Sequence, residues 1–189
     1  MDGKRKIVAV FGGSFNPPHI AHVLAVTTVL CTVEVDRVMV VPAYQHPFAK
    51  ELASYDARVA MTELAVGWLP RVEVSRVEQA LGGESRTLRT LERLQADHPE
   101  WLLRLVVGAD ILNEAHKWHG FERIVAIAPL IVLGRVGIEA PGAPEPILPR
   151  VSSTEVRAAA ALRDMSRLEA LVPRQVVRYI EEHKLYGIA

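Results

Sequence analysis

Two histidines close a glycine- and proline-rich stretch near the start of the chain, at residues 12–22. Residues three apart lie on one face of a helix, so His19 and His22 can face the same side of a first helical turn. Gly12 and Gly13 open the stretch directly after an apolar run, where the lack of a Cβ lets the backbone turn sharply and approach a ligand. Backbone amides near a helix start attract phosphate groups. The pattern therefore predicts a site that binds a polyphosphate and stabilises the charge that moves during its reaction.

Two alternatives compete with this interpretation. The first is a Gly-Pro turn whose histidines only cap or hydrogen-bond locally, which fits poorly with a histidine pair set between a strand and a helix. The second is zinc, but no Cys, Asp or Glu lies at ligand spacing nearby. The phosphate site is preferred over both.

Further charged residues follow later apolar runs. Asp110 comes after the run at residues 102–107, and Arg135 comes after the run at residues 130–133. Parallel strands end at one edge of a sheet, where ligands bind in open α/β folds. We therefore expect Asp110 to have a functional role and Arg135 to contact a phosphate.

Hydrophobic patterning indicates the elements that must position these residues. Nearly continuous apolar runs, typical of strands buried on both faces of a parallel sheet, lie at residues 7–11, 37–41, 72–77, 102–107 and 130–133. Helical patterns lie at residues 21–33, 56–66, 87–96, 152–163 and 174–183. Residues 136–150 hold four prolines and two glycines and are expected to form a loop. The alternation predicts the α/β class: a Rossmann-like, doubly wound parallel sheet of about five or six strands with C-terminal helices.

Composition limits the function classes. The chain has 189 residues, with 22 Lys and Arg against 22 Asp and Glu, and residues 1–189 are interpreted as a single domain. Zero formal net charge argues against a protein that binds nucleic acid by general phosphate attraction. No apolar stretch approaches the roughly 18 residues of a membrane span, so we expect a cytoplasmic protein with no membrane partner. The single cysteine, Cys31, is expected to be a small core residue of an apolar helix. Trp68 and Trp101 lie at element boundaries and are expected to be packing residues.

The motif at residues 12–22 resembles the N-terminal signature of the nucleotidyltransferase superfamily, which ends His-x-x-His. Ala21 stands where that signature usually has glycine. Residues 151–157, Val-Ser-Ser-Thr-Glu-Val-Arg, resemble the Ile-Ser-Ser-Thr-x-x-Arg segment of the nicotinate (nicotinamide) mononucleotide adenylyltransferase family. Further similarity extends the resemblance over nearly the whole chain, at residues 108–110, Trp118 and residues 171–186.

The resemblance implies roles for individual residues. The catalytic residues would be His19, His22 and Arg157. ATP would bind to Gly12, Gly13, Ser14, Phe15, His19, His22, Gly108, Asp110, Ser153, Thr154 and Arg157. The pyridine mononucleotide would bind to Lys50, Thr87, Trp118 and Arg135, with the indole stacking on the pyridine ring. Mg²⁺ would accompany ATP by bridging its phosphate oxygens, and no residue of the chain is assigned to a metal.

The sequence departs from the family pattern around the acceptor. Arg86 and Arg89 replace the Tyr and Asp of the family's Ser-Tyr-Thr-x-Asp-Thr segment. Residues 46–50, His-Pro-Phe-Ala-Lys, replace Pro-Pro-His-Lys, which leaves open the cation that binds the mononucleotide phosphate. Lys50 and Arg58 are as compatible with a solvated surface charge as with a binding role.

The activity that the resemblance implies is adenylyl transfer from ATP to nicotinate mononucleotide, giving the deamido-NAD dinucleotide and pyrophosphate. The same chemistry on nicotinamide mononucleotide or phosphopantetheine is an open alternative, as is a non-catalytic nucleotide-binding module. The expected partners are ATP and a pyridine mononucleotide, without nucleic acid, and a homo-oligomer is left open.

Overall fold

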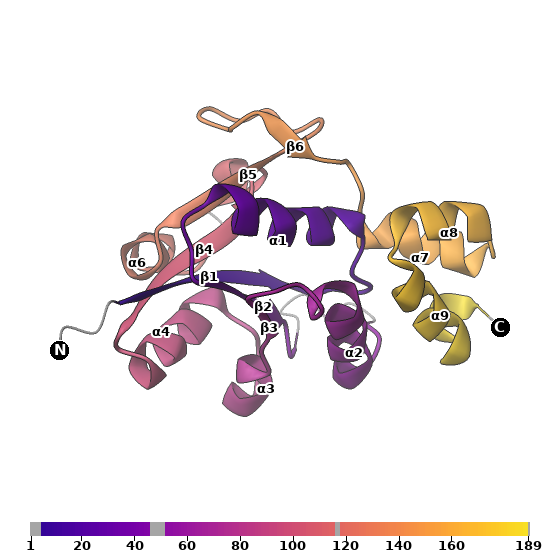
Figure 1. Cartoon of the computed structure of the whole chain (residues 1–189), viewed down its shortest axis with the longest axis horizontal. Coiled ribbons are helices and arrows are strands. Elements are labelled where there is room, and N and C mark those ends of the chain that lie inside the picture. The colour runs from indigo at the N-terminus through magenta and orange to yellow at the C-terminus, as the bar shows by residue number, and fades with distance from the viewer. Residues whose placement is uncertain (1–4, 46–51, 116–117, 189) are drawn as a thin grey trace.

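A sheet of six parallel strands forms the centre of the structure, a computed structural model that describes residues 5–45, 52–115 and 118–188 (Figure 1). The strands are β1 (Lys6–Gly13), β2 (Arg37–Pro42), β3 (Val72–Val74), β4 (Trp101–Gly108), β5 (Leu130–Arg135) and β6 (Pro146–Leu148). Their order in the sheet is β3-β2-β1-β4-β5-β6. The chain builds outward from β1 on one side and then on the other, so the strand order reverses between β1 and β4. The predicted doubly wound, Rossmann-like fold is confirmed.

Helices connect the strands and cover the sheet. They are α1 (Ile20–Thr32), α2 (Tyr55–Val66), α3 (Val77–Leu81), α4 (Thr87–Asp97), α5 (Ile111–Glu114), α6 (Phe121–Ile127), α7 (Ser153–Ala161), α8 (Met165–Leu171) and α9 (Arg174–Glu182), followed by the 3-10 helix η2 (Leu185–Gly187). The C-terminal helices α7, α8 and α9 gather at one side of the molecule, away from the N-terminus (Figure 1). No helix in the described part of the chain combines the length and apolar character needed to cross a membrane.

Side chains of β1 alternate between two cores, as strand geometry requires. Ala9 belongs to a cluster that includes residues of α1, α2 and the C-terminal helices. Val8 and Val10 belong to a second cluster, which includes residues of α4 and α6. Burial on both faces explains why the apolar run of this strand is continuous rather than alternating.

Two expected elements differ in the structure. The strand expected at residues 72–77 ends at Val74, because the Ser75 hydroxyl accepts the N–H of Val77 and α3 begins there. The stretch at residues 136–150, expected to be a loop, contains β6, which pairs with β5 as the edge strand. Pro146 is tolerated as its first residue, since an edge position does not require every N–H donor.

Two side chains expected to be buried are exposed. Cys31 is exposed because the buried residues of α1, which include Ala25 and Val29, occupy another face of that helix. Trp68, expected to be a packing residue, is 67% exposed just after α2. Trp101, expected to be a packing residue, is buried.

Candidate active site

The predicted functional residues of several strands meet at the carboxyl edge of the sheet. Gly13 at the end of β1 is in register with Pro42 of β2, and Gly108 of β4 is in register with Leu133 of β5. Asp110 lies two residues after the end of β4, and Arg135 is the last residue of β5. These positions surround the reversal of strand order between β1 and β4, which is where ligands bind in open α/β sheets.

The loop after β1 leaves room for a ligand on one side and packs on the core on the other. A Cβ added at Gly12 would meet no atom within 4 Å, whereas one at Gly13 would lie 3.1 Å from the ring of Phe15. Phe15 adopts a positive φ of 45° and is 1% exposed, with its ring edge-on to Phe11 at 5.7 Å. The side chain of Phe15 is therefore a core group, and only its main chain is available to a ligand.

The two histidines lie against each other at the start of α1. Their rings stack with centroids 3.8 Å apart, and the ring of Phe15 packs against His22 at 4.9 Å. The backbone N–H of His19 donates to Nδ1 of His22 at 3.1 Å. Because Nδ1 accepts this bond, neutral His22 carries its proton on Nε2 and presents that N–H as a donor. The predicted shared face of the pair is confirmed.

Both histidines favour the neutral form. Burial, helped by the charge of Arg135, lowers the pKa of His19 to about 4. Burial also lowers the pKa of His22 well below its usual range, and His19 and Arg135 act in the same direction. At neutral pH the pair therefore offers N–H donors rather than fixed positive charges.

The depressed pKa of His19 predicts a loss of stability in mild acid. The unfolded chain binds a proton as the pH falls through 6.5, while the folded chain does so only near pH 4. The free energy of unfolding should therefore fall between pH 7 and pH 5, with His19 alone contributing on the order of 2 kcal/mol. Urea unfolding of wild type and His19→Asn at both pH values measures this contribution. Equal losses of stability in the two proteins between these pH values would contradict it.

The start of α7 reaches the loop after β1. Ser152 caps the helix by accepting the N–H of Glu155, and the Ser153 hydroxyl donates to the carbonyl of Pro17 at 2.9 Å. The Arg157 guanidinium donates to the main-chain oxygen of Asn16 at 2.8 Å. A second N–H of Arg157 reaches the Thr154 hydroxyl at 3.2 Å. The structure thus brings residues near the two ends of the chain to one loop, as the sequence motifs predict.

Arg135 lies close enough to the histidine pair for its charge to lower both of their pKa values. Its guanidinium donates to the Val151 carbonyl at 3.0 Å. Its Nε is buried and has no hydrogen-bond partner among the described residues. Because Arg135 is near the histidines, its charge favours phosphate binding at this edge.

Asp110 and Gly108 form a compact turn after β4. A Cβ on Gly108 would collide with the carboxylate of Asp110, so only glycine fits while Asp110 keeps this conformation. The Asp110 side chain is exposed and does not cap α5. Its carboxylate remains available to a ligand hydroxyl.

The predicted acceptor residues are only partly brought together. Thr87 is the first residue of α4, and Trp118 packs partly buried against the second core with its ring edge-on to Phe121. Lys50 lies outside the described residues.

The two arginines that depart from the family pattern have local partners. Arg89 donates to the carbonyls of Leu81 and Gly82 at the end of α3, which satisfies main-chain oxygens that the helix leaves free. Arg86 pairs with exposed Glu84 at 2.6 Å. These contacts make Arg89 a stabilising residue of the α3–α4 connection.

Arg58, for which the sequence leaves a solvated surface charge and a binding role open, is 2% exposed. It donates to four main-chain carbonyls, those of Ser14, Ala43, Tyr44 and Ala53. Burial lowers the pKa of Arg58. No sequence pattern separates this arginine from a solvated one, because its partners are main-chain oxygens that carry no sequence signal.

The sequence analysis also assigns no binding or catalytic role to Asn16, which lies in the loop after β1, or to Tyr186, which contacts it. Asn16 is 1% exposed, and its side-chain oxygen accepts the Tyr186 hydroxyl at 2.8 Å. Their positions were the available signal: Asn16 lies inside the motif at residues 12–22, and Tyr186 lies inside the similar segment at residues 171–186.

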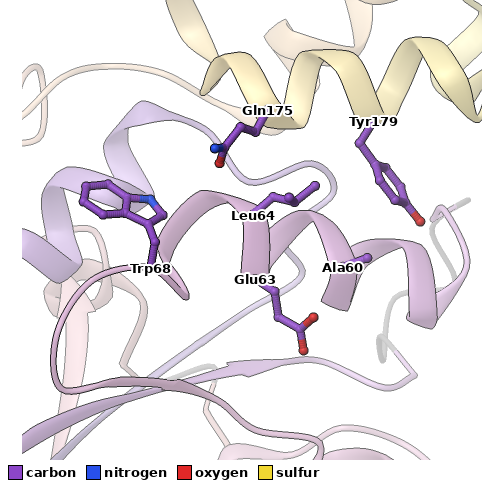
Figure 2. A pocket seen from close by; sticks show the side chains of 6 residues that line it. All are labelled: Ala60, Glu63, Leu64, Trp68, Gln175 and Tyr179. Carbon is purple, nitrogen blue, oxygen red and sulfur yellow. The ribbon is translucent and has the colours of Figure 1, made fainter.

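A groove of about 460 Å³, called here the α2–α9 groove, lies away from the loop after β1, between α2 and α9 (Figure 2). It is lined by Ala60, Glu63, Leu64, Trp68, Gln175 and Tyr179. Among these six residues the charged one is acidic, and its carboxylate points away from α9 (Figure 2). None of its six lining residues carries a positive charge, and none of them belongs to the loop after β1 or to α7, so this groove is not the nucleotide site.

Comparison with known proteins agrees with the geometry. The cytidylyltransferase-like family matches residues 10–159. A protein of Anaeromyxobacter dehalogenans named "Probable nicotinate-nucleotide adenylyltransferase" is 47% identical over 190 residues, which cover 98% of this chain and 99% of that protein. A protein of the same name from Myxococcus xanthus is 41% identical over 188 residues, covering 96% of this chain and 95% of that protein.

A solved structure shares the fold. The nicotinic acid mononucleotide adenylyltransferase of Plasmodium falciparum, complexed with NaAD, superposes with a TM-score of 0.84 at 18% identity. The match covers 97% of this chain and 98% of that chain. At this identity it supports the architecture alone, whereas the bacterial relatives support the family. The chain belongs to the cytidylyltransferase-like family and, within it, to the nicotinate-nucleotide adenylyltransferases.

Proposed function

We propose that this chain transfers the adenylyl group of ATP to nicotinate mononucleotide, forming the deamido-NAD dinucleotide and pyrophosphate. The observation that carries this proposal is the meeting of His19, His22 and Arg157 around the loop after β1. The names of the bacterial relatives support the choice of substrates. The reaction is one step in NAD biosynthesis.

The chemistry is a direct displacement at the α-phosphorus of ATP. An oxygen of the 5′-phosphate of the mononucleotide forms the new P–O bond, while the bond between the α-phosphorus and its bridging oxygen breaks. Pyrophosphate leaves with that bridging oxygen and its electron pair. No covalent intermediate with the protein is required, so the chain contributes orientation and charge stabilisation.

The histidine pair and Arg157 act on the triphosphate. The Nε2–H of His22 donates to phosphate oxygens whose negative charge grows as the displacement proceeds, and His19 lies stacked beside it. Arg157 is held toward the loop by the Asn16 carbonyl and supplies a permanent positive charge. Neutral imidazoles suit this role because they can donate without first binding a proton from solvent.

Mg²⁺ is proposed to arrive with ATP. Among the described residues no three His, Cys, Asp or Glu side chains gather closely enough to hold a metal ion. Magnesium commonly keeps several waters and binds through substrate phosphates, which requires no protein cage. When bound, it would neutralise part of the phosphate charge.

Pyrophosphate release from ATP with a panel of acceptors tests the proposal. Nicotinate mononucleotide should give the highest kcat/KM, and nicotinamide mononucleotide and phosphopantetheine are the comparison acceptors. A higher kcat/KM with either comparison acceptor would reject the proposed substrate. ATP binding without pyrophosphate release for any acceptor would instead indicate a non-catalytic nucleotide-binding module.

For the acceptor, we propose that Trp118 stacks on the pyridine ring. Trp118→Leu should raise the KM for nicotinate mononucleotide about tenfold, the effect of losing one aromatic stacking contact, and leave the KM for ATP unchanged. Trp68→Leu, which changes an exposed indole in the α2–α9 groove, is the matched control and should change neither constant. Equal effects of Trp118→Leu on both KM values would reject the stacking role.

We further propose that Thr87 contacts the acceptor through its main chain and that Lys50 and Arg135 contact its phosphate. The same proposal places the enzyme in the cytoplasm, acting on small molecules as a single domain.

A further inference from the structure

Asn16 joins three segments that are far apart in the sequence. Its side-chain oxygen accepts the backbone N–H of Ala53 at 3.0 Å and the hydroxyl of Tyr186 at 2.8 Å. Its main-chain oxygen accepts the guanidinium of Arg157 at 2.8 Å. The backbone N–H of Ala53 can only donate, so the side-chain atom facing it must be the oxygen, and the Tyr186 hydroxyl must donate to that same oxygen.

The backbone around Tyr186 is bent to deliver this hydroxyl. Lys184 and Tyr186 both adopt left-handed conformations, with φ values of 50° and 59°. The left-handed conformation is unfavourable for residues other than glycine, so surrounding contacts must hold the turn in place. Ile188 is buried just beyond it, and Tyr186 itself packs against the first core. The turn therefore holds the phenol against the loop after β1.

Tyr186 also remains a donor over the working pH range. Burial raises the pKa of its hydroxyl, although the nearby charges of Arg157 and Arg58 oppose that shift. The phenol thus lies beside the guanidinium that Asn16 orients, yet its hydroxyl bonds to Asn16 and not to Arg157.

We propose that Tyr186 is a positioning residue of the phosphate site. Its hydroxyl fixes the side chain of Asn16, and the main-chain carbonyl of Asn16 in turn directs Arg157 toward the triphosphate of ATP. This inference rests on the proposed adenylyl transfer and adds to it a residue that touches neither substrate. The contact spans 170 residues and connects η2 to the loop that carries the histidine pair.

A double-mutant cycle tests the proposal. Tyr186→Phe removes only the hydroxyl. It should lower the affinity for ATP and the kcat about tenfold each, and it should leave the KM for the mononucleotide unchanged. In an Arg157→Ala background the same change should have less than a twofold effect, because the residue through which it acts is gone. Calorimetric titration with ATP and single-turnover rates provide the two readouts, and the rates stay measurable when binding is weak.

Tyr179→Phe is the matched control. The ring of Tyr179 stacks on His183 and lines the α2–α9 groove. Removing the Tyr179 hydroxyl should leave ATP affinity and the single-turnover rate unchanged. The proposal would be overturned if Tyr186→Phe lowered ATP affinity and the single-turnover rate equally in the two backgrounds. It would also be overturned if both losses were below twofold in the wild-type background. Because ATP binding is measured without turnover, a protein that binds ATP but transfers nothing would reject the proposed function and still decide the role of Tyr186.

Discussion

Replacing His22 with alanine is expected to lower kcat by about 10²–10³-fold, the usual effect of removing one donor that acts on the transition state. The Nε2–H of His22 meets charge that grows only as the displacement proceeds, so affinity for ground-state ATP should change by a few-fold at most. Steady-state rates of pyrophosphate release and direct titration with ATP measure the two effects separately.

Two further substitutions of His22 separate the loss of its N–H donor from an effect on the local structure. His22→Asn keeps an oxygen at the place of Nδ1, able to accept the N–H of His19, but lacks the distal donor, and should be as slow as the alanine variant. His22→Gln can carry an N–H at the place of Nε2 and should recover part of the rate. His98→Ala, which removes an imidazole stacked on Trp101 at the opposite edge of the sheet, should behave as wild type. A kcat for His22→Asn within a few-fold of wild type would reject the assigned role.

Arg58→Met is expected to lower the free energy of unfolding by about 3–5 kcal/mol. Four carbonyls now bonded to one buried guanidinium would lose their donor, and each unsatisfied buried acceptor costs about 1–3 kcal/mol. The net loss is smaller than their sum, because removing the charge also removes its own desolvation penalty. Urea unfolding at neutral pH measures the difference.

A control and a second variant make this result specific. Arg93→Met breaks an exposed pair with Asp97 one helical turn away and should change stability by less than about 0.5 kcal/mol. Arg58→Lys keeps the charge but has three donors on one nitrogen, which cannot span carbonyls from separate segments, so it should fall between wild type and Arg58→Met. A loss below 1 kcal/mol for Arg58→Met would show that water replaces the guanidinium at little cost.

The sequence was sufficient for those features that arise from local pattern. The four strands β1, β2, β4 and β5 have apolar runs, and their burial on both faces produces that signal. β3 has only Val72 and Val74 on either side of the exposed Glu73. β6 has no such run, because its three residues lie among prolines and pair through main-chain atoms. The histidine pair was predictable for a similar reason, since helix geometry alone places residues three apart on one face.

Other parts of the site depend on contacts between distant segments. The burial of Arg58 requires carbonyls from the loop after β1, from the adjacent residues Ala43 and Tyr44, and from Ala53. The bond from Tyr186 to Asn16 requires the left-handed turn at the end of α9. Each of these partners is a main-chain group or a residue more than a hundred positions away, which hydrophobic periodicity does not report.

The partners of Asn16 have a consequence for synthesis of the chain. The loop carrying the histidines is synthesised before the residues whose groups bond to Asn16, which are residues 53, 157 and 186. A nascent chain holding only the first strands would expose the buried polar groups of this loop without the bonds that satisfy them. The hydrogen bonds of Asn16 are therefore complete only after residue 186 has been synthesised, so the loop reaches its final conformation later than the strand that precedes it.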